Sequence, residues 1–549
     1  MTMENATTAT IGHATAGPAL MAPAARTARG NVGSGFLAAY PGYATTARLD
    51  ELRAAEYSYL DSGGHTYLDY AGAGLAADVQ LRTHTGRVRG GCFGNPHSEN
   101  PASRASSVLI EQARDAVLRY FNAPADEYAV IFTPNATGAC RLVGEAYPFW
   151  RQSRLVLTAD NHNAVNGLRE FARPLGAAVS YVGFSPADLR VTDTDISAAL
   201  GCGESPGRER RRGLFAYPAQ SNFSGVQHPL AWVDQAQAAG WDVLLDAAAF
   251  VPTSRLDLGV VKPEFVTVSW YKMFGYPTGI GCLLARRDAL ARMRRPWFSG
   301  GTVWGASVQG GFHRLADDET AFEDGTVNYL SIPDVTTGLD WINGIDIDLI
   351  HRRVGYLTGW LLRSLVGLKH GNGAPMVRLY GPPDGTARGG TVAFNFLDPG
   401  GAVVDERAVV RDTSAAGISV RAGCFCNPGA WERAFGLTGP AVRGTRWRAF
   451  PPPNVPTVDD YLELTGLPSG GAIRVSLGLV SNIGDIEHFL DFAERTYRDR
   501  EPSRHGLAPR LRCLPARTGG PARRAAPLRP QARSGVGRQL ASGLVTRIR

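Results

Sequence analysis

The sequence predicts an α/β fold, in which helices cover both faces of a parallel or mostly parallel sheet and a second, smaller domain follows. Short apolar runs alternate with helical patterns over residues 106–285, and this alternation is typical of such sheets. From about Ile345 the pattern changes to a long helix and then to mixed elements, which indicates the second domain. The length agrees, because 549 residues exceed the roughly 250–300 at which single cores stop growing.

The individual elements follow from local patterns. Residues 106–121 have helical spacing, and Ser106 at their start predicts an N-terminal cap. Apolar runs of strand length predict strands at residues 130–132, 155–157, 213–217, 243–246, 265–269 and 280–285. Further along, four prolines within residues 450–456 predict a loop.

These patterns divide the chain into four parts. Residues 1–35, which begin with a stretch rich in Ala, Thr and Gly, are expected to be a flexible leader. They lack the charged start and apolar stretch of a secretory signal. Residues 36–343 are the predicted large domain, with part of its N-terminal segment joining the small domain of residues 344–498. Residues 499–549, rich in Arg and Pro, are expected to be a disordered tail.

The net charge of +7 does not predict a nucleic-acid-binding protein, because the charge is unevenly placed. Eleven arginines and no acidic residue lie beyond Pro502, and the rest of the chain has 46 basic residues against 50 acidic ones. No apolar run approaches the roughly 18 residues that a membrane span requires. Seven cysteines in so long a chain do not indicate a disulfide framework, which favours a reducing, cytoplasmic setting.

Lysine usage points to a single reactive amine. The chain has only three lysines, Lys262, Lys272 and Lys369, and nearly every other basic position is arginine. Arginine can replace lysine on a surface but cannot form a Schiff base, because its guanidinium does not lose its proton. Lys272 follows an apolar strand and stands among aromatic residues before a glycine-containing turn. A desolvated amine there would be a nucleophile toward a carbonyl group, so Lys272 is the predicted Schiff-base residue.

Other residues at strand ends match the needs of a Schiff-base cofactor with a ring nitrogen and a phosphate. Asp246 ends an apolar strand 26 residues before Lys272, where its carboxylate could hold the ring nitrogen or merely cap a helix. Thr137, in a strand–turn–helix pattern, and Ser269 offer hydroxyls to a phosphate. His162 could stack on the ring. Each of these residue types is more often structural, so the interpretation depends on their partnership with Lys272.

A cysteine loop is the second feature with chemical meaning. Residues 421–429 read Arg-Ala-Gly-Cys-Phe-Cys-Asn-Pro-Gly, and the glycines, asparagine and proline indicate a loop that can move. Metal binding would need further Cys or His ligands at zinc spacing, and none follows. A structural Cys-x-Cys is one alternative for Cys424 and Cys426. A nucleophilic thiol on a mobile loop is the interpretation that fits the neighbouring cofactor residues.

Together these segments resemble the class V aminotransferase and cysteine desulfurase family, most closely the desulfurase domain of molybdenum cofactor sulfurases. The matching segments are Ser-Trp-Tyr-Lys-Met-Phe-Gly-Tyr-Pro-Thr-Gly around Lys272, the cysteine loop, and the segments that begin at Tyr67, Asp160 and Phe322. The resemblance covers about residues 40–498. It implies a fold-type I pyridoxal-phosphate-dependent transferase, with a large mixed seven-stranded sheet domain, a smaller C-terminal α+β domain, and a site at the interface of a homodimer.

The resemblance also implies the reaction and the role of each residue. Pyridoxal 5'-phosphate would be the cofactor and L-cysteine the substrate, whose sulfur would pass to the loop thiol as a persulfide while alanine leaves. The implied roles are the Schiff base and proton transfer for Lys272, the ring nitrogen for Asp246, stacking for His162, the phenolic oxygen for Gln220, the phosphate for Thr137 and Ser269, the nucleophile for Cys426, and the substrate carboxylate for Arg474.

Two departures from the family pattern limit the expected function. Tyr271 precedes the lysine where many desulfurases have histidine. Where full sulfurases continue into a molybdopterin-binding domain, the arginine-rich tail follows, so the sulfur acceptor is expected to be a separate protein or something other than the molybdenum cofactor. Alternative functions are another class V activity, namely a transaminase, a β-lyase or an epimerase, and a non-catalytic scaffold that works through its basic tail.

Overall fold

A computed structural model describes residues 32–185, 188–202, 212–437 and 469–501, and the single residues 459, 462, 467 and 507. The predicted leader up to residue 31, the predicted loop at residues 450–456 and nearly all of the predicted tail lie outside the described residues. The domain boundaries near residues 343 and 498 stay a prediction.

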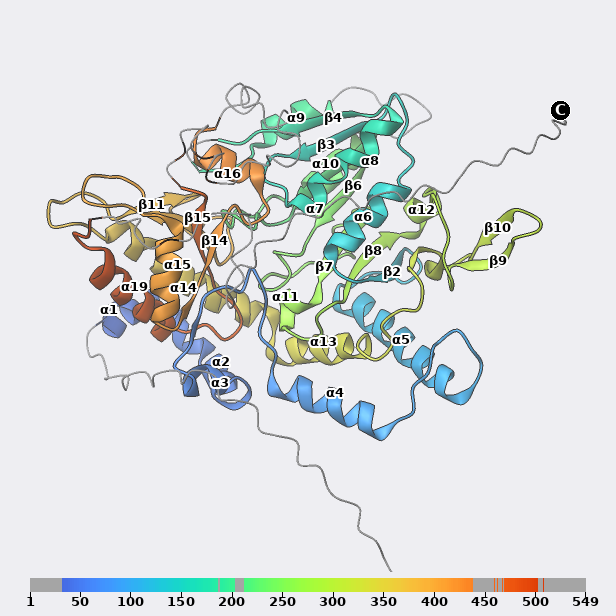
Figure 1. The fold of residues 1–549 in the computed structure, drawn as a ribbon, viewed down its shortest axis with the longest axis horizontal. Helices are drawn as coiled ribbons and strands as arrows, with labels where there is room; N and C mark the ends of the chain where they lie inside the picture. The colour runs from blue at the N-terminus through green and yellow to red at the C-terminus, as the bar shows by residue number, and fades with distance from the viewer. Residues whose placement is uncertain are drawn as a thin grey trace, which may run out of the picture.

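The largest element is a seven-stranded mixed sheet (Figure 1), which confirms the predicted α/β fold. One strand, β8, is antiparallel to both of its neighbours, and the other six strands run parallel to one another. All six predicted strands lie in this sheet. In spatial order its strands are β2 (Tyr128–Thr133), β8 (Gly281–Arg286), β7 (Phe265–Ser269), β6 (Trp241–Asp246), β5 (Gly213–Pro218), β3 (Arg154–Thr158) and β4 (Ala178–Val182).

The sheet separates two apolar layers, because successive side chains of a strand point to opposite faces. In β2, Val130 and Phe132 enter one layer, and Ala129 and Ile131 enter the other. Helices that contribute to the first layer are α5 (Pro101–Tyr120), α9 (Asp193–Leu200), α10 (Trp232–Ala238) and α13 (Pro333–Ile345). Those that contribute to the second are α6 (Ala136–Ala146), α7 (Asn163–Asn166), α8 (Arg169–Ala172) and α12 (Arg287–Leu290).

A smaller antiparallel sheet follows in the C-terminal part of the described chain. Its strands, in spatial order, are β11 (Val377–Tyr380), β12 (Thr391–Phe396), β15 (Ala472–Ser476) and β14 (Arg421–Gly423). The helices in this part are α14 (Ile347–Gly367), α15 (Glu406–Ala415), α16 (Pro428–Ala434) and α19 (Ile483–Tyr497). The short strands β1 (Thr66–Tyr67) and β13 (Ile418–Ser419) pair in parallel, which brings an N-terminal segment to this sheet.

The remaining elements lie around these two sheets. A hairpin of β9 (Val303–Ser307) and β10 (Phe312–Leu315) projects from the body (Figure 1). No helix in the described part of the chain is both long and apolar enough to cross a lipid bilayer. The other elements are α1 (Val32–Ala39), η1 (Pro41–Thr46), α2 (Arg48–Glu56), α3 (Tyr59–Ser62), α4 (Asp78–Gly90), η2 (Arg173–Leu175), α11 (Trp270–Phe274) and η3 (Glu319–Phe322).

The structure corrects the predicted start of one helix. Helix α5 begins at Pro101, and its cap is Asn100, whose side-chain oxygen accepts a hydrogen bond from the Ser103 amide at 3.0 Å. Ser106, the predicted cap, is buried inside the helix. An asparagine followed by proline is a stronger start signal than the serine six residues after that asparagine, because proline at the first helical position has its backbone angle already set.

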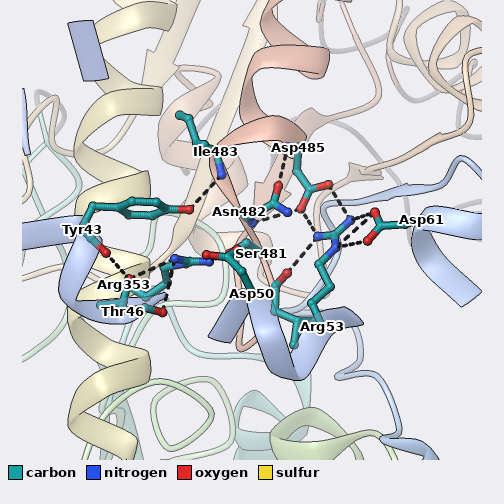
Figure 2. A network of polar contacts seen from close by, with 11 residues as sticks. Tyr43, Thr46, Asp50, Arg53, Asp61, Arg353, Ser481, Asn482, Ile483 and Asp485 are labelled. Carbon is teal, nitrogen blue, oxygen red and sulfur yellow. Dashed lines mark hydrogen bonds and ion pairs between the residues drawn. The ribbon is translucent and has the colours of Figure 1, made fainter. Parts of the chain in front are cut away.

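Two buried arginines fasten the N-terminal helices to α14 and α19 (Figure 2). Arg53, which is 2% exposed, forms ion pairs with Asp485 at 2.5 Å and Asp61 at 2.9 Å. Arg353 of α14 contacts Asp50 and donates to the Thr46 hydroxyl at 3.0 Å. The N-terminal segment is therefore joined to the C-terminal helices by ion pairs, of which the one between Arg53 and Asp485 is buried on both sides. A buried pair of this kind is costly to break.

We predict that Arg53→Met lowers the free energy of unfolding by about 3–5 kcal/mol, because it leaves the carboxylate of Asp485 buried without its cation. Urea denaturation measures the effect. Arg82→Met is the matched control, since Arg82 is 58% exposed and pairs at the surface with Asp78, where a loss below about 1 kcal/mol is expected. Equal losses in the two variants would contradict the structural role of Arg53.

Candidate active site

Four parallel strands of the large sheet end at one edge, and a polar side chain lies at or just beyond each end. Asp246 and Ser269 are the last residues of β6 and β7. His162 follows β3, and Gln220 follows β5. In sheets of this kind, ligands bind in the crevice outside the carboxyl ends of the strands.

A cavity of about 330 Å³ lies at this edge. Its volume falls within the range of about 300–1,000 Å³ that is usual for small-molecule sites. All six residues predicted to hold the cofactor line it, and they are Thr137, His162, Gln220, Asp246, Ser269 and Lys272. Residues spread between positions 137 and 272 of the chain therefore meet around one cavity.

The three lysines have different surroundings. Lys272 lies in α11, directly after β7, and its side chain lines the cavity. Lys262 pairs with Glu127 at 2.7 Å, and Lys369 is exposed. Among the described residues, Lys272 is thus the one lysine at the cavity.

The carboxylate of Asp246 is oriented by its neighbours. The hydroxyl of Thr267 donates to its Oδ1 at 3.1 Å, and the amide of Ala248 donates to the same oxygen at 3.0 Å. Both hydrogen bonds end on the same oxygen, so the carboxylate is held at one end while it faces the cavity. The alternative that Asp246 merely caps the following segment is also supported, because its bond from the Ala248 amide, two residues later, is a contact typical of turns.

His162 presents a neutral ring to the cavity. Its Nδ1 caps α7 by accepting a hydrogen bond from the Ala164 amide at 3.1 Å, which places the ring proton on Nε2. Burial, reinforced by the nearby cation of Lys272, lowers the pKa of His162 to about 4. The imidazole is therefore uncharged at neutral pH.

The N-terminus of α6 opens onto the same cavity. Asn135 caps this helix through a hydrogen bond from the Gly138 amide at 2.9 Å, and Thr137 is exposed on the first turn. Gly281 of β8 permits the approach, since an added Cβ would lie 2.8 Å from the Ala136 amide nitrogen. Helix N-termini attract anions, and the hydroxyl of Ser269 lines the cavity as well.

Asn222, which the sequence interpretation missed, connects the cavity with the cysteine loop. It lines the cavity, and its side-chain nitrogen donates to the backbone oxygen of Phe425 at 2.7 Å. Its own backbone oxygen accepts from Arg474 at 3.0 Å. The polar run after β5, which also contains Gln220, was the available signal. It could not reveal partners that are more than 200 positions away.

Hydrogen bonds join the cysteine loop, which the sequence predicts can move, to the residues that follow β3. Cys426 is exposed, but its backbone oxygen accepts a hydrogen bond at 2.7 Å from the amide of Asn163, the neighbour of His162. The next residue, Asn427, is completely buried. The loop lies against the end of β3, because Asn427 also donates to the Asp160 backbone oxygen at 2.6 Å. Cys426 itself is not part of the cavity wall.

A second thiol lies at the cavity, and its burial disfavours the reactive thiolate form. The side chain of Cys140, on α6, lines the cavity but is fully buried. Burial raises the pKa of this thiol, with the charge of Asp246 adding to the effect, so it stays protonated. The exposed Cys426 is therefore the better candidate for a nucleophile.

Arg474 lies on β15, outside the cavity wall, in an ion-pair network with Asp69. Asp69 accepts from Arg474 at 3.0 Å and from Arg421 at 2.6 Å. The bonds to Asp69 raise the pKa of Arg421, whereas burial lowers the pKa of Arg474 against the opposing effect of the same carboxylate. The Nε atom of Arg474 is buried without a hydrogen-bond partner. Asp69, in the segment that begins at Tyr67, had no role in the sequence interpretation.

Known proteins resemble the chain in sequence. Molybdenum cofactor sulfurase of Solanum lycopersicum is 35% identical over 505 residues, which cover 87% of this chain and 60% of that protein. Molybdenum cofactor sulfurase of Homo sapiens is 34% identical over 466 residues, which cover 81% and 51%. The chain thus spans between about half and three fifths of the length of these relatives.

Solved structures share the fold. A cysteine desulfurase from Thermococcus onnurineus superposes with a TM-score of 0.66 at 20% identity, covering 81% of this chain and 97% of that one. The cysteine desulfurase CsdA from Escherichia coli gives 0.63 at 20% identity, with 81% and 98% covered. The model of the aminotransferase class-V family matches residues 66–489, and the chain belongs to this family.

Proposed function

We propose that the chain is a pyridoxal-phosphate-dependent cysteine desulfurase. The single observation that carries the proposal is the cavity where Lys272, Asp246 and His162 meet a helix N-terminus, with the exposed thiol of Cys426 held beside it. The names of the relatives, molybdenum cofactor sulfurase and cysteine desulfurase, support it.

The residues at the cavity fit pyridoxal phosphate. Lys272 supplies the amine that would hold the aldehyde, and the Asp246 carboxylate would receive the ring nitrogen. A neutral His162 can stack on a cationic ring without charge repulsion. Thr137, Ser269 and the first turn of α6 would receive the phosphate. Gln220 is assigned to the phenolic oxygen, although its Oε1 already accepts a hydrogen bond from Gln227 at 3.0 Å.

When bound, pyridoxal phosphate withdraws electrons from the bonds at the α-carbon of an amino acid. The amine of Lys272 takes the proton from the substrate α-carbon and returns a proton to the product. The Cys426 thiolate forms an S–S bond with the substrate sulfur. The electron pair of the broken carbon–sulfur bond remains with the β-carbon, which gains a proton to give alanine. The sulfur stays on Cys426 as a persulfide.

Arg474 is proposed to hold the substrate carboxylate. Its unpartnered Nε is a buried donor, and a guanidinium can bind a carboxylate through two parallel hydrogen bonds. Asp69 shares its charge between Arg474 and Arg421, so the three groups together carry a positive charge. The carboxylate of the substrate would meet this charge near the cavity, because Arg474 bonds to Asn222, which lines the cavity.

The sulfur acceptor and the assembly are proposals as well. The names of the relatives support the molybdenum cofactor as the destination of the sulfur, either directly or through a separate protein. We propose a homodimer, because Trp304 and Phe312 on the projecting hairpin are 74% and 62% exposed, and exposed apolar patches often mark protein interfaces. A thiol that carries sulfur also needs reducing surroundings, which supports a cytoplasmic setting.

We predict that Lys272→Ala abolishes the visible absorbance of the bound cofactor, because no other described lysine lies at the cavity. Absorbance spectra of the purified variants measure this. Lys369→Ala is the matched control, because this lysine is exposed, and its spectrum should equal that of the wild type. Bleaching in the control with a normal Lys272→Ala spectrum would reject the assignment.

We predict that Cys426→Ser abolishes alanine and persulfide formation from L-cysteine, while the cofactor still binds. A serine hydroxyl is too weakly acidic and too poor a nucleophile toward sulfur to replace the thiolate. Cys424→Ser should have a smaller effect, since Cys424 is less exposed. Undiminished alanine from Cys426→Ser would favour a β-lyase or a transaminase. Loss of persulfide only in Cys424→Ser would move the nucleophile by two residues.

We predict that His162→Asn weakens the pH dependence of stability. The folded pKa of about 4 lies below the ordinary 6.5, so the unfolded chain binds the proton more tightly. The contribution of neutral His162 to the free energy of unfolding is therefore complete above about pH 6.5 and is lost as the pH falls toward 4. Asparagine keeps the cap of α7 and removes the titration. Urea denaturation at pH 5 and pH 7 should show a stability difference about 1–2 kcal/mol smaller than in the wild type. His313→Asn, at an exposed residue, is the control.

A further inference from the structure

The central residues of the cysteine loop, 424–427, have a backbone conformation that they would not adopt by themselves. Phe425 and Cys426 both have a φ of 55°, in the left-handed region that non-glycine residues rarely occupy. Two consecutive residues of this kind persist only where surrounding contacts compensate for the strain. The compensating contacts therefore determine where the thiol of Cys426 lies.

Asn427 supplies most of these contacts. Its side-chain nitrogen donates to the backbone oxygen of Asp160 at 2.6 Å and to the side-chain oxygen of Asn222 at 3.0 Å. Its side-chain oxygen caps α16 by accepting from the Ala430 amide at 3.2 Å. Its own amide donates to the Cys424 backbone oxygen at 2.9 Å, which closes the loop on itself. All the hydrogen-bonding groups of this buried side chain are thus in use.

The partners of Asn427 belong to the cavity wall or adjoin it. Asn222 lines the cavity, and Asp160 lies two positions before His162. Asn222 also donates to the Phe425 backbone oxygen at 2.7 Å, so two side-chain bonds join this residue to the loop. The loop and the cavity are consequently held in one hydrogen-bonded unit.

Gly429 makes the close approach possible. A Cβ at this position would lie 1.9 Å from the Ala159 backbone oxygen, so any larger residue would push the start of α16 away from the end of β3. Asn427 and Gly429 thus maintain the contact between the cysteine loop and the end of β3 in different ways. Asn427 contributes hydrogen bonds, and Gly429 leaves room because it has no side chain.

We propose that Asn427 is a positioning residue for sulfur transfer, which holds the thiol of Cys426 beside the cofactor cavity through the bonds of its side-chain nitrogen. The inference rests on the proposed desulfurase function and adds a residue to it. Asn427 contacts neither substrate nor cofactor in this scheme. It acts through the backbone of Cys426, and a displacement of about 1 Å can cost on the order of a hundredfold in rate.

Asn427→Asp tests the proposal in the full-length enzyme with its cofactor. Aspartate caps a helix as well as asparagine does, so α16 keeps its cap, but the carboxylate cannot donate to Asp160 or Asn222. We expect alanine formation from L-cysteine to fall about 10–100-fold in kcat. The KM for L-cysteine and the absorbance of the bound cofactor should stay at wild-type values, because Lys272 is unchanged and Arg474 bonds to Asp69 and to the backbone oxygen of Asn222, not to residue 427.

Asn100→Asp is the matched control. Asn100 also caps a helix with its side-chain oxygen and donates with its nitrogen, here to the Ser98 hydroxyl at 3.1 Å, far along the chain from the loop. The kcat of the Asn100→Asp enzyme should equal that of the wild type. Gly429→Ala is the second variant, and it should lower kcat in the same way because it separates the same surfaces.

Hydrogen exchange provides a readout that does not depend on activity. The amides of Asn163 and Asn427 donate to the loop oxygens and should exchange faster in Asn427→Asp, while the capped Ala430 amide keeps its protection. An unchanged kcat would overturn the proposal. A lower kcat accompanied by cofactor loss would also overturn it, since the role would then be structural. A wild-type enzyme that forms no persulfide would reject the proposed function, while faster exchange at Asn163 would still support the positioning of the loop.

Discussion

Parallel strands that begin at one edge of a sheet must all end at the other, and the candidate site depends on this constraint. Residues that follow β3, β5, β6 and β7 reach one cavity although they are far apart in the chain. The antiparallel strand β8 contributes differently, because Gly281 at its start lets the N-terminus of α6 lie against the sheet. One sheet edge thereby offers an amine, a carboxylate, a neutral ring and an anion-attracting helix end to the same ligand.

The same constraint explains what could be predicted from the sequence. β5, β6 and β7 are buried almost throughout, so their residues are mostly apolar, and the polar residues Asp246 and Ser269 that end β6 and β7 are conspicuous. β4 was missed because it is an edge strand with partly exposed positions. The contacts of Asn222 with Phe425 and of Asp69 with Arg474 were out of reach, since 203 and 405 positions separate the partners and no local pattern records such pairings.

The part of the site around Arg474 depends on contacts between the N-terminal segment and the C-terminal strands and helices. β15 carries Arg474, and the bridge between Asp69 and Ser476 brings the N-terminal segment alongside it. That segment is fixed further back by Arg53, which pairs with Asp485 at the start of α19 (Figure 2). The ion pair at the N-terminal helices therefore has a consequence for the site, because it holds the strand from which Asp69 reaches Arg474.

A tethered loop changes what is required of the sulfur acceptor. Cys426 is exposed although both of its neighbours, Phe425 and Asn427, are buried, so its backbone is held on each side. A mobile loop could carry a persulfide to a distant acceptor, whereas a loop that keeps these hydrogen bonds leaves the sulfur where it was formed. On the proposed function, the acceptor must therefore approach Cys426 and fit the surface around it. Selection of the acceptor then depends on the shape and charge of that surface. The proposed chemistry at Lys272 does not require the acceptor to be bound.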